Sequence, residues 1–176
     1  MDTVIYPDEI RHKIKSGHII LWKGKGLISR IIRLFSEYSH ASLVVRLDRY
    51  KGLKDRVFLI EALATGLEPR LLSKRLKHYK GEAFILVPDD ITDELAEKIT
   101  VLALEKCAEH IKYDFKSLVK NIFGRVSLSA RQFFCSEWVW WVRVKLGLSK
   151  NGIAPRPGDL PKLIPGKIYK LEYRGD

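Results

Sequence analysis

One apolar stripe at helical spacing, with a cysteine at its start, constrains the fold of this chain more than any other feature. The stripe recurs at intervals of three and four residues and so lies on one face of a helix, which Gly147 can end. Its members are Cys135, Trp138, Val139, Val142 and Leu146. A thiol in the first turn of a helix lies at the positive end of the helix dipole, which favours a thiolate. Cys135 is therefore either a nucleophile or, as free cysteines more often are, a small buried hydrophobic residue.

Strand-like segments and helical segments share the rest of the chain. The segment Pro88-Asp89-Asp90 is expected to cap a long amphipathic helix. We predict strands over residues 18–22, 39–47, 57–63, 83–87 and 168–173, and helices over residues 7–17, 27–35 and 92–110, with a short helix up to Phe123 before the cysteine helix. This order predicts one α+β domain over residues 1–176, with a small, mostly antiparallel sheet or partial barrel packed on the helices that carry Cys135 and Thr92.

The charge balance indicates an anionic partner. There are 32 Lys and Arg residues against 21 Asp and Glu residues, a formal charge of +11. The densest basic segment, residues 70–80, is expected to be a solvated helix, with a surface for phosphate or lipid head groups as the alternative. None of the common nucleic-acid-binding motifs occurs.

Several other classes of protein are disfavoured by the sequence. No apolar run approaches the roughly 18 residues of a membrane span, and the first residues lack the apolar core of a signal peptide, so we expect a cytoplasmic protein. Cys107 and Cys135 form no zinc-type spacing. We therefore predict no metal or cofactor, and we assign Cys107, which shares a stripe with core residues, a structural role.

Two polar residues in strands could complete a site for Cys135. His40 opens the strand 39–47, where alternation places it on one face with Ser42 and Val44. Glu61 is the one carboxylate within the apolar strand 57–63, and it needs either water at a strand end or a partner. On neighbouring strands, His40 could donate a ring N–H to Glu61, whereas in the alternative case Glu61 pairs with a surface Lys or Arg.

These residue types match the roles of a thiol hydrolase. A histidinium close to a cysteine favours the thiolate, and a carboxylate can hold the imidazole in place. We assign Cys135 as nucleophile, His40 as base and Glu61 as the orienting group, and we expect the Cys135 backbone N–H to help hold the oxyanion. His18, which opens another strand, is the main rival to His40.

Short motifs along nearly the whole chain resemble one enzyme family. They are Gly17-His18-Ile19-Ile20-Leu21, Gly26-Leu27-Ile28-Ser29, Tyr38-Ser39-His40-Ala41-Ser42-Leu43-Val44-Val45, Ile60-Glu61-Ala62, Tyr113-Asp114-Phe115, Phe134-Cys135-Ser136-Glu137 and Pro157-Gly158-Asp159-Leu160. In this order they resemble the circularly permuted, NlpC-type papain-like cysteine hydrolases, and most of all the YiiX and YebB group. The resemblance implies a Cys135, His40 and Glu61 triad, with Tyr113 near the substrate. His18 stands where the family usually has Asp.

The predicted function is thiol-dependent hydrolysis of an amide bond in a peptide, an isopeptide or a cell-wall peptide. One alternative is a lipid esterase, thioesterase or acyltransferase with the same nucleophile, as in the related lecithin retinol acyltransferase-like enzymes. Another is a non-catalytic binding module on the same fold. In each case the basic charge favours an anionic substrate or partner.

Overall fold

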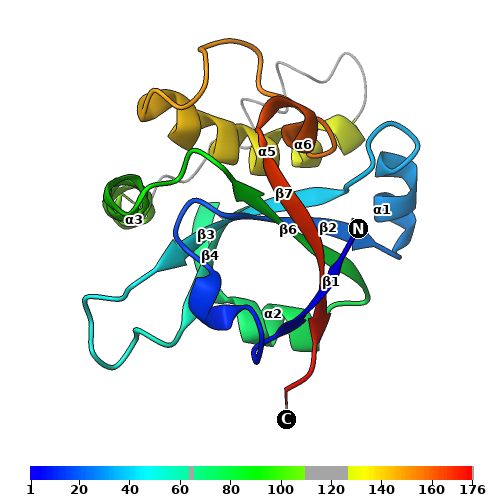
Figure 1. Cartoon of the computed structure of the whole chain (residues 1–176). Coiled ribbons are helices and arrows are strands. Elements are labelled where there is room, and N and C mark those ends of the chain that lie inside the picture. The colour runs from blue at the N-terminus through cyan, green and yellow to red at the C-terminus, as the bar shows by residue number, and fades with distance from the viewer. Residues whose placement is uncertain (64–65, 110–126, 176) are drawn as a thin grey trace.

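The fold is built around one sheet of seven strands in the order β1-β7-β6-β2-β3-β4-β5. The computed structural model describes residues 1–63, 66–109 and 127–175. All neighbouring strands are antiparallel except β1 and β7, which are parallel. The strands are β1 (Thr3–Tyr6), β2 (Ile19–Gly24), β3 (His40–Arg46), β4 (Val57–Leu63), β5 (Gly66–Leu71), β6 (Gly81–Pro88) and β7 (Gly166–Tyr173). Figure 1 shows that the sheet curls into a partial barrel, as the sequence predicted.

Helices cover the sheet on both of its faces. The helices are η1 (Arg11–Lys13), α1 (Leu27–Ile32), α2 (Leu72–Lys77), α3 (Asp93–Ala108), α5 (Ser127–Lys145) and α6 (Leu160–Leu163). Helix α5 packs on β3 and β4, and α3 packs on β3 and β5, while α2 lies against β4, β5 and β7. Within the described ranges, no helix combines the length and the apolar character that crossing a membrane requires.

Strand alternation divides the buried apolar residues between two clusters. On β3, Ala41, Leu43 and Val45 pack with the stripe of α5, whereas Val44 packs on the inner face with Trp22 of β2. His40 and Ser42 share the face of Val44, as the alternation predicted. The inner face of the curled sheet therefore carries the polar residues of β3.

The sequence missed two strands, and both lie at the edges of the sheet. Strand β1 has only four residues, and β5 contains Pro69 among polar residues. Proline and charged residues are typical of edge strands, which cannot be recognised from an apolar pattern. At the N-terminus, the 3-10 turn η1 replaces the helix expected over residues 7–17.

The start of α3 also differs from the expectation. The Thr92 hydroxyl accepts a hydrogen bond from the Leu95 N–H at 3.2 Å, so Thr92 is the cap rather than the segment Pro88-Asp89-Asp90. The Asp90 carboxylate instead binds the buried Arg143 guanidinium of α5 at 2.5 and 3.3 Å. This bidentate pair joins α5 to the loop that precedes α3.

The largest correction concerns the start of the cysteine helix. Helix α5 begins at Ser127, so Cys135 lies in its third turn and not in its first. The predicted end is confirmed, because Gly147 has a φ of 73° and the N–H of Leu148 bonds the carbonyl of Arg143 at 2.8 Å. The predicted short helix up to Phe123 lies outside the described residues.

Candidate active site

Two adjacent antiparallel strands bring His40 and Glu61 together. In the register of β3 and β4, Leu43 lies opposite Ile60, and extending it by one residue places Glu61 opposite Ser42. His40 lies two residues further along β3, a diagonal position that long side chains can span. The His40 ring nitrogen Nε2 lies 2.9 Å from Glu61 Oε1, which agrees with the sequence-based pairing.

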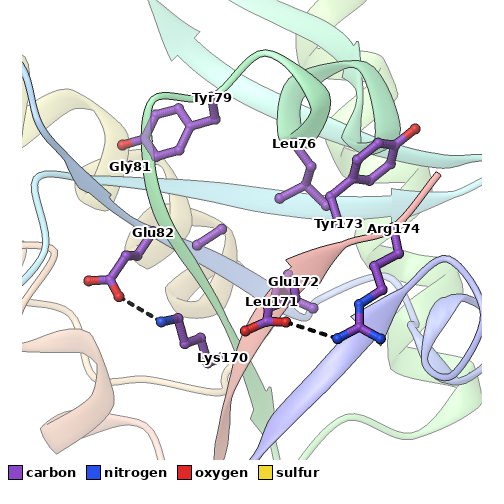
Figure 2. A pocket seen from close by; sticks show the side chains of 10 residues that line it. Leu76, Tyr79, Gly81, Glu82, Lys170, Leu171, Glu172, Tyr173 and Arg174 are labelled. Atoms are coloured by element: carbon purple, nitrogen blue, oxygen red, sulfur yellow. Dashed lines mark ion pairs between the residues drawn. The ribbon is translucent and has the colours of Figure 1, made fainter. Parts of the chain in front are cut away.

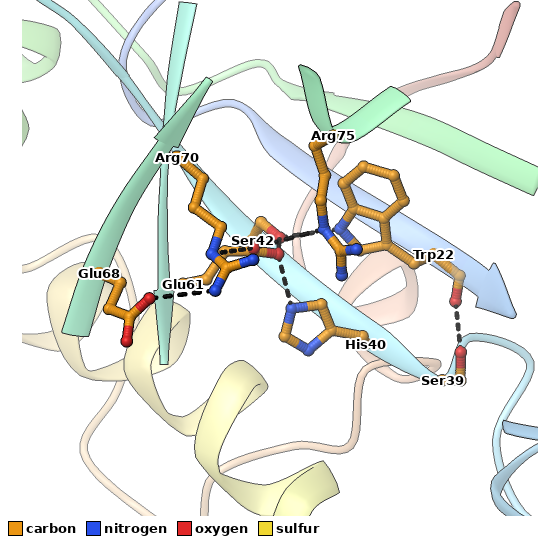
Figure 3. Close-up of polar contacts among 8 residues, drawn as sticks. All are labelled: Trp22, Ser39, His40, Ser42, Glu61, Glu68, Arg70 and Arg75. Carbon is orange, nitrogen blue, oxygen red and sulfur yellow. Dashed lines mark hydrogen bonds and ion pairs between the residues drawn. The ribbon is translucent and has the colours of Figure 1, made fainter. Parts of the chain in front are cut away.

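A buried hydrogen-bond chain fixes the Glu61 carboxylate. Its side chain is fully buried, and Oε1 accepts a hydrogen bond from the Ser42 hydroxyl at 2.7 Å. The Ser42 hydroxyl in turn accepts one from the Trp22 indole N–H at 2.8 Å. Figure 3 shows this chain beside the His40 ring. Because Ser42 donates to Oε1 as well, the carboxylate has little freedom to turn away from His40.

The second carboxylate oxygen faces two arginines. Glu61 Oε2 lies 3.4 Å from Arg75 Nε and 3.7 Å from Arg70 Nε, and Arg70 also binds Glu68 at 3.1 Å. Glu61 therefore has both of the partners that the sequence offered as alternatives, a histidine and a basic side chain of the Lys or Arg type. The basic segment forms helix α2 over Leu72–Lys77, in agreement with the expected helix. Two of its arginines also approach this carboxylate (Figure 3).

Cys135 reaches His40 from the opposite layer. It is fully buried on α5 and makes a side-chain hydrogen bond with His40. Since Glu61 occupies Nε2, this contact falls to Nδ1. The His40 side chain is 19% exposed, so the imidazole is the part of the pair that solvent reaches. Because a helix dipole acts mainly within its first turn, the environment of Cys135 depends on His40 and not on the start of α5.

The charges of this cluster support one another. Burial alone would lower the pKa of His40, but Cys135 and Glu61 on its two sides raise that pKa to about 9. Burial would raise the pKa of Glu61, but His40, Arg75 and Ser42 lower it to about 2. The site thus favours a charged imidazolium on His40, paired with the Glu61 carboxylate, at neutral pH.

The rival residues lie elsewhere. His18 Nδ1 accepts a hydrogen bond from the Lys15 backbone N–H at 3.4 Å, and burial together with the Lys15 charge lowers the pKa of His18 to about 4. Cys107 is half-buried against the apolar cluster that contains the stripe of α5, and burial raises the pKa of its thiol. Tyr113, expected near the substrate, lies outside the described residues.

Three residues around the pair were not assigned to the site from the sequence. Ser42 carried a usable signal, because it follows His40 by two positions and so shares its face. Arg70 and Arg75 carried none, because their approach to Glu61 depends on how β5 pairs with β4 and how α2 crosses the sheet.

Other hollows of the molecule are separate from this cluster. A cavity of about 370 Å³ lies between α2 and strands β6 and β7. Figure 2 shows the side chains that line it. Its charged residues pair with one another, Glu82 with Lys170 at 2.8 Å and Glu172 with Arg174 at 3.6 Å. A larger cavity of about 640 Å³ lies between α3 and the loop after β3. Neither is lined by Cys135, His40 or Glu61, so neither is the candidate active site.

The comparisons with known proteins support the fold. No protein-family model matches the sequence, and no curated protein matches it. Among solved structures, the chain is similar to the metalloprotein YiiX from Escherichia coli O157:H7, with a TM-score of 0.53 and 22% identity. The similarity covers 74% of this chain and 65% of the YiiX chain. This chain thus shares with YiiX an α+β fold with a mostly antiparallel sheet.

The YiiX structure is that of a metalloprotein. Within residues 1–63, 66–109 and 127–175, no group of three or more His, Cys, Asp or Glu side chains is arranged to hold a metal ion. The cluster of Cys135, His40 and Glu61 instead places a thiol and a carboxylate in hydrogen-bond contact with the same imidazole ring.

Proposed function

We propose that the protein is a cysteine hydrolase of the permuted papain-like, NlpC type that cleaves an amide bond. The observation that carries the proposal is the His40 ring held between the Cys135 side chain and the buried Glu61 carboxylate. In a buried cluster such an arrangement has a high energetic cost unless every charge is paired. Nucleophilic thiol catalysis gives a reason to maintain it.

The reaction proceeds in two steps. His40 holds the proton taken from the Cys135 thiol, the thiolate sulfur attacks the carbonyl carbon, and the carbonyl π electrons move to oxygen. When the tetrahedral species collapses, the C–N bond breaks and the leaving nitrogen takes a proton from His40. Water then attacks the thioester, His40 accepts the water proton, and the C–S bond breaks to release a carboxylic acid and restore Cys135.

One part of the sequence-based mechanism needs revision. In the interior of an α-helix, the N–H of a residue bonds the carbonyl four residues earlier. Cys135 lies inside α5, where such a bond would occupy its backbone N–H, so the helix does not favour the predicted oxyanion role. The oxyanion must be held by another donor.

The proposal is tested by turnover. Wild-type protein, Cys135→Ala and Cys107→Ala are incubated with peptidoglycan fragments, isopeptide conjugates and phospholipids, and products are identified by mass spectrometry. We expect amide cleavage by wild type and Cys107→Ala and none by Cys135→Ala. Turnover of phospholipids alone would transfer the assignment to lipid acyl chemistry, and equal loss in both variants would remove Cys135 as nucleophile.

A further inference from the structure

A basic cavity lies next to the Glu61 carboxylate. It measures about 580 Å³ and is formed by β5 and α2, with one wall of β4. Arg70, Lys74 and Arg75 line it together with His78, and Glu68 is the one carboxylate in its lining. Anions are therefore favoured in this cavity over neutral or cationic groups.

Most of its charged groups are already paired. Arg70 binds Glu68 at 3.1 Å, and Arg75 lies against the buried Glu61. Lys74 differs, because it is exposed and makes no ion pair with any residue that the structure describes. The cavity thus contains one lysine whose charge is not balanced within the described protein, beside two arginines whose carboxylate partners leave N–H donors available.

The remaining lining is apolar. Phe58, Pro69 and Leu71 also line the cavity. Small-molecule sites typically combine such apolar walls with a few polar groups that fix the orientation of the ligand. A ligand that fits both parts has a carboxylate or phosphate group attached to an apolar body.

The cavity and the catalytic pair share one carboxylate. Glu61 Oε1 faces His40 and Ser42, whereas Oε2 faces Arg70 and Arg75, which line the cavity (Figure 3). The buried Arg75 Nε has no hydrogen-bond partner among the described residues, although it lies 3.4 Å from Oε2. An anion in the cavity would therefore compete with Glu61 for these guanidinium groups.

We propose that this cavity binds an organic anion, a carboxylate or phosphate monoester with an apolar body, and that its occupancy changes the environment of His40 through Arg70, Arg75 and Glu61. The binding claim does not depend on the proposed function. The coupling claim deepens the proposed function, because it places an anion-binding site on the far side of the triad carboxylate from Cys135.

Binding of phenyl phosphate is measured by calorimetry. Inorganic phosphate and benzyl alcohol are measured beside it, to represent the anionic group and the apolar body separately. Lys74→Ala tests the cavity, and Lys77→Ala is the matched control because Lys77 is exposed on the same helix but does not line the cavity. We expect binding to weaken about tenfold in Lys74→Ala, as for loss of one charge-assisted contact, and less than twofold in Lys77→Ala. No binding by wild type, or equal weakening in both variants, would overturn the proposal.

Coupling is measured in Cys135→Ala, so that its outcome does not depend on turnover. The Nε–Hε resonances of Arg70 and Arg75 and the ring resonances of His40 are followed by NMR during titration with phenyl phosphate. We expect the resonances of Arg70, Arg75 and His40 all to shift in the Cys135→Ala protein. When Lys74→Ala is added to it, the same shifts should need about tenfold more ligand. Arginine shifts without any shift of the His40 ring at saturating ligand would overturn the coupling while leaving the proposed hydrolase function intact.

A second arm tests the coupling at Cys135. The rate at which iodoacetamide alkylates Cys135 in wild type is measured with and without saturating phenyl phosphate. Because the cavity lies on the far side of Glu61 from Cys135, the ligand acts on the thiol only through Glu61 and His40. A changed rate would therefore support the coupling, and an unchanged rate at saturating ligand would overturn it.

Discussion

At the scale of single residues, Glu61 has the greatest influence on the site. It is fully buried, and its two oxygens divide their partners between His40 with Ser42 and Arg70 with Arg75. The sequence showed that this carboxylate needed a partner, because an isolated charge in an apolar strand has a large cost. It could not show that there are several, because the arginines reach it from another strand and another helix.

Glu61→Gln tests the orienting role. The amide keeps the shape and an acceptor but loses the charge that stabilises the imidazolium of His40. We expect the variant to fold, while kcat/KM falls by about ten- to a thousand-fold, a loss of roughly 1.4 to 4 kcal/mol. The matched control is Glu68→Gln, which also removes a carboxylate that binds Arg70 but does not touch His40. Equal kinetics for both variants would reduce the site to a Cys135 and His40 pair.

The pKa values of the two histidines near strand starts, His40 and His18, are shifted in opposite directions. His40 has a pKa raised to about 9 by Cys135 and Glu61 in spite of its burial, and His18 has a pKa lowered to about 4 by burial and Lys15. Between pH 5 and pH 8, His40 should therefore stay charged and His18 neutral. Ring nitrogen shifts from NMR, assigned with His40→Ala and His18→Ala, measure this directly. A neutral His40 at pH 7 would contradict the charge arrangement.

The same values fix how stability depends on pH. The folded-state pKa of His40 lies above its ordinary value of 6.5, so its protonation stabilises the fold fully below pH 6.5, and this contribution is lost as the pH rises through about 9. For Glu61 the folded-state pKa of about 2 lies below 4.5, so its contribution is full above pH 4.5 and is lost as the pH falls through about 2. His18, whose folded-state pKa of about 4 lies below 6.5, contributes fully only above pH 6.5. The three groups together therefore place the greatest stability of the fold near pH 6.5.

At the scale of elements, α5 connects the core to the site. Its stripe buries Trp138, Val139 and Val142 against the outer face of the sheet. This packing brings Cys135 to His40, the first residue of β3. The face of the helix was predictable from its 3.6-residue period, but its start was not, because the apolar stripe begins only at Cys135. Helix limits are set by capping groups that need not coincide with the apolar stripe.

Gly147→Ala tests how α5 ends. The φ of 73° is a left-handed conformation that costs an alanine about 1 kcal/mol, while an added Cβ would meet no atom within 4 Å. We expect the free energy of unfolding to fall by about 1 kcal/mol, as measured by denaturant titration. Gly152→Ala is the control, because that site is equally open but has no left-handed φ, and the same loss in both variants would contradict this explanation.

At the scale of the whole molecule, the sequence predicted the sheet class, five of its strands and the apolar face of α5. It also offered the pairing of His40 with Glu61 on the condition that their strands are neighbours, and the structure meets that condition. It missed β1 and β5, which are short or polar edge strands, and the arginines that approach Glu61. These depend on contacts between distant parts of the chain, which no local pattern encodes.

The pairing of Cys135 with His40 is the central claim, and the pH dependence of Cys135 alkylation tests it most directly. Wild type, His40→Ala and His18→Ala are treated briefly with iodoacetamide between pH 5.5 and pH 9, and modification of each cysteine is quantified by mass spectrometry. Below its ordinary pKa of about 8.5, an unpaired thiol reacts about tenfold more slowly for each unit by which the pH falls, because the thiolate fraction falls tenfold. We predict that Cys135 in wild type and in His18→Ala reacts at pH 6 at a rate close to its rate at pH 8, that His40→Ala restores the steep dependence, and that Cys107 shows that dependence throughout. A steep dependence for Cys135 in the wild-type protein would contradict the account.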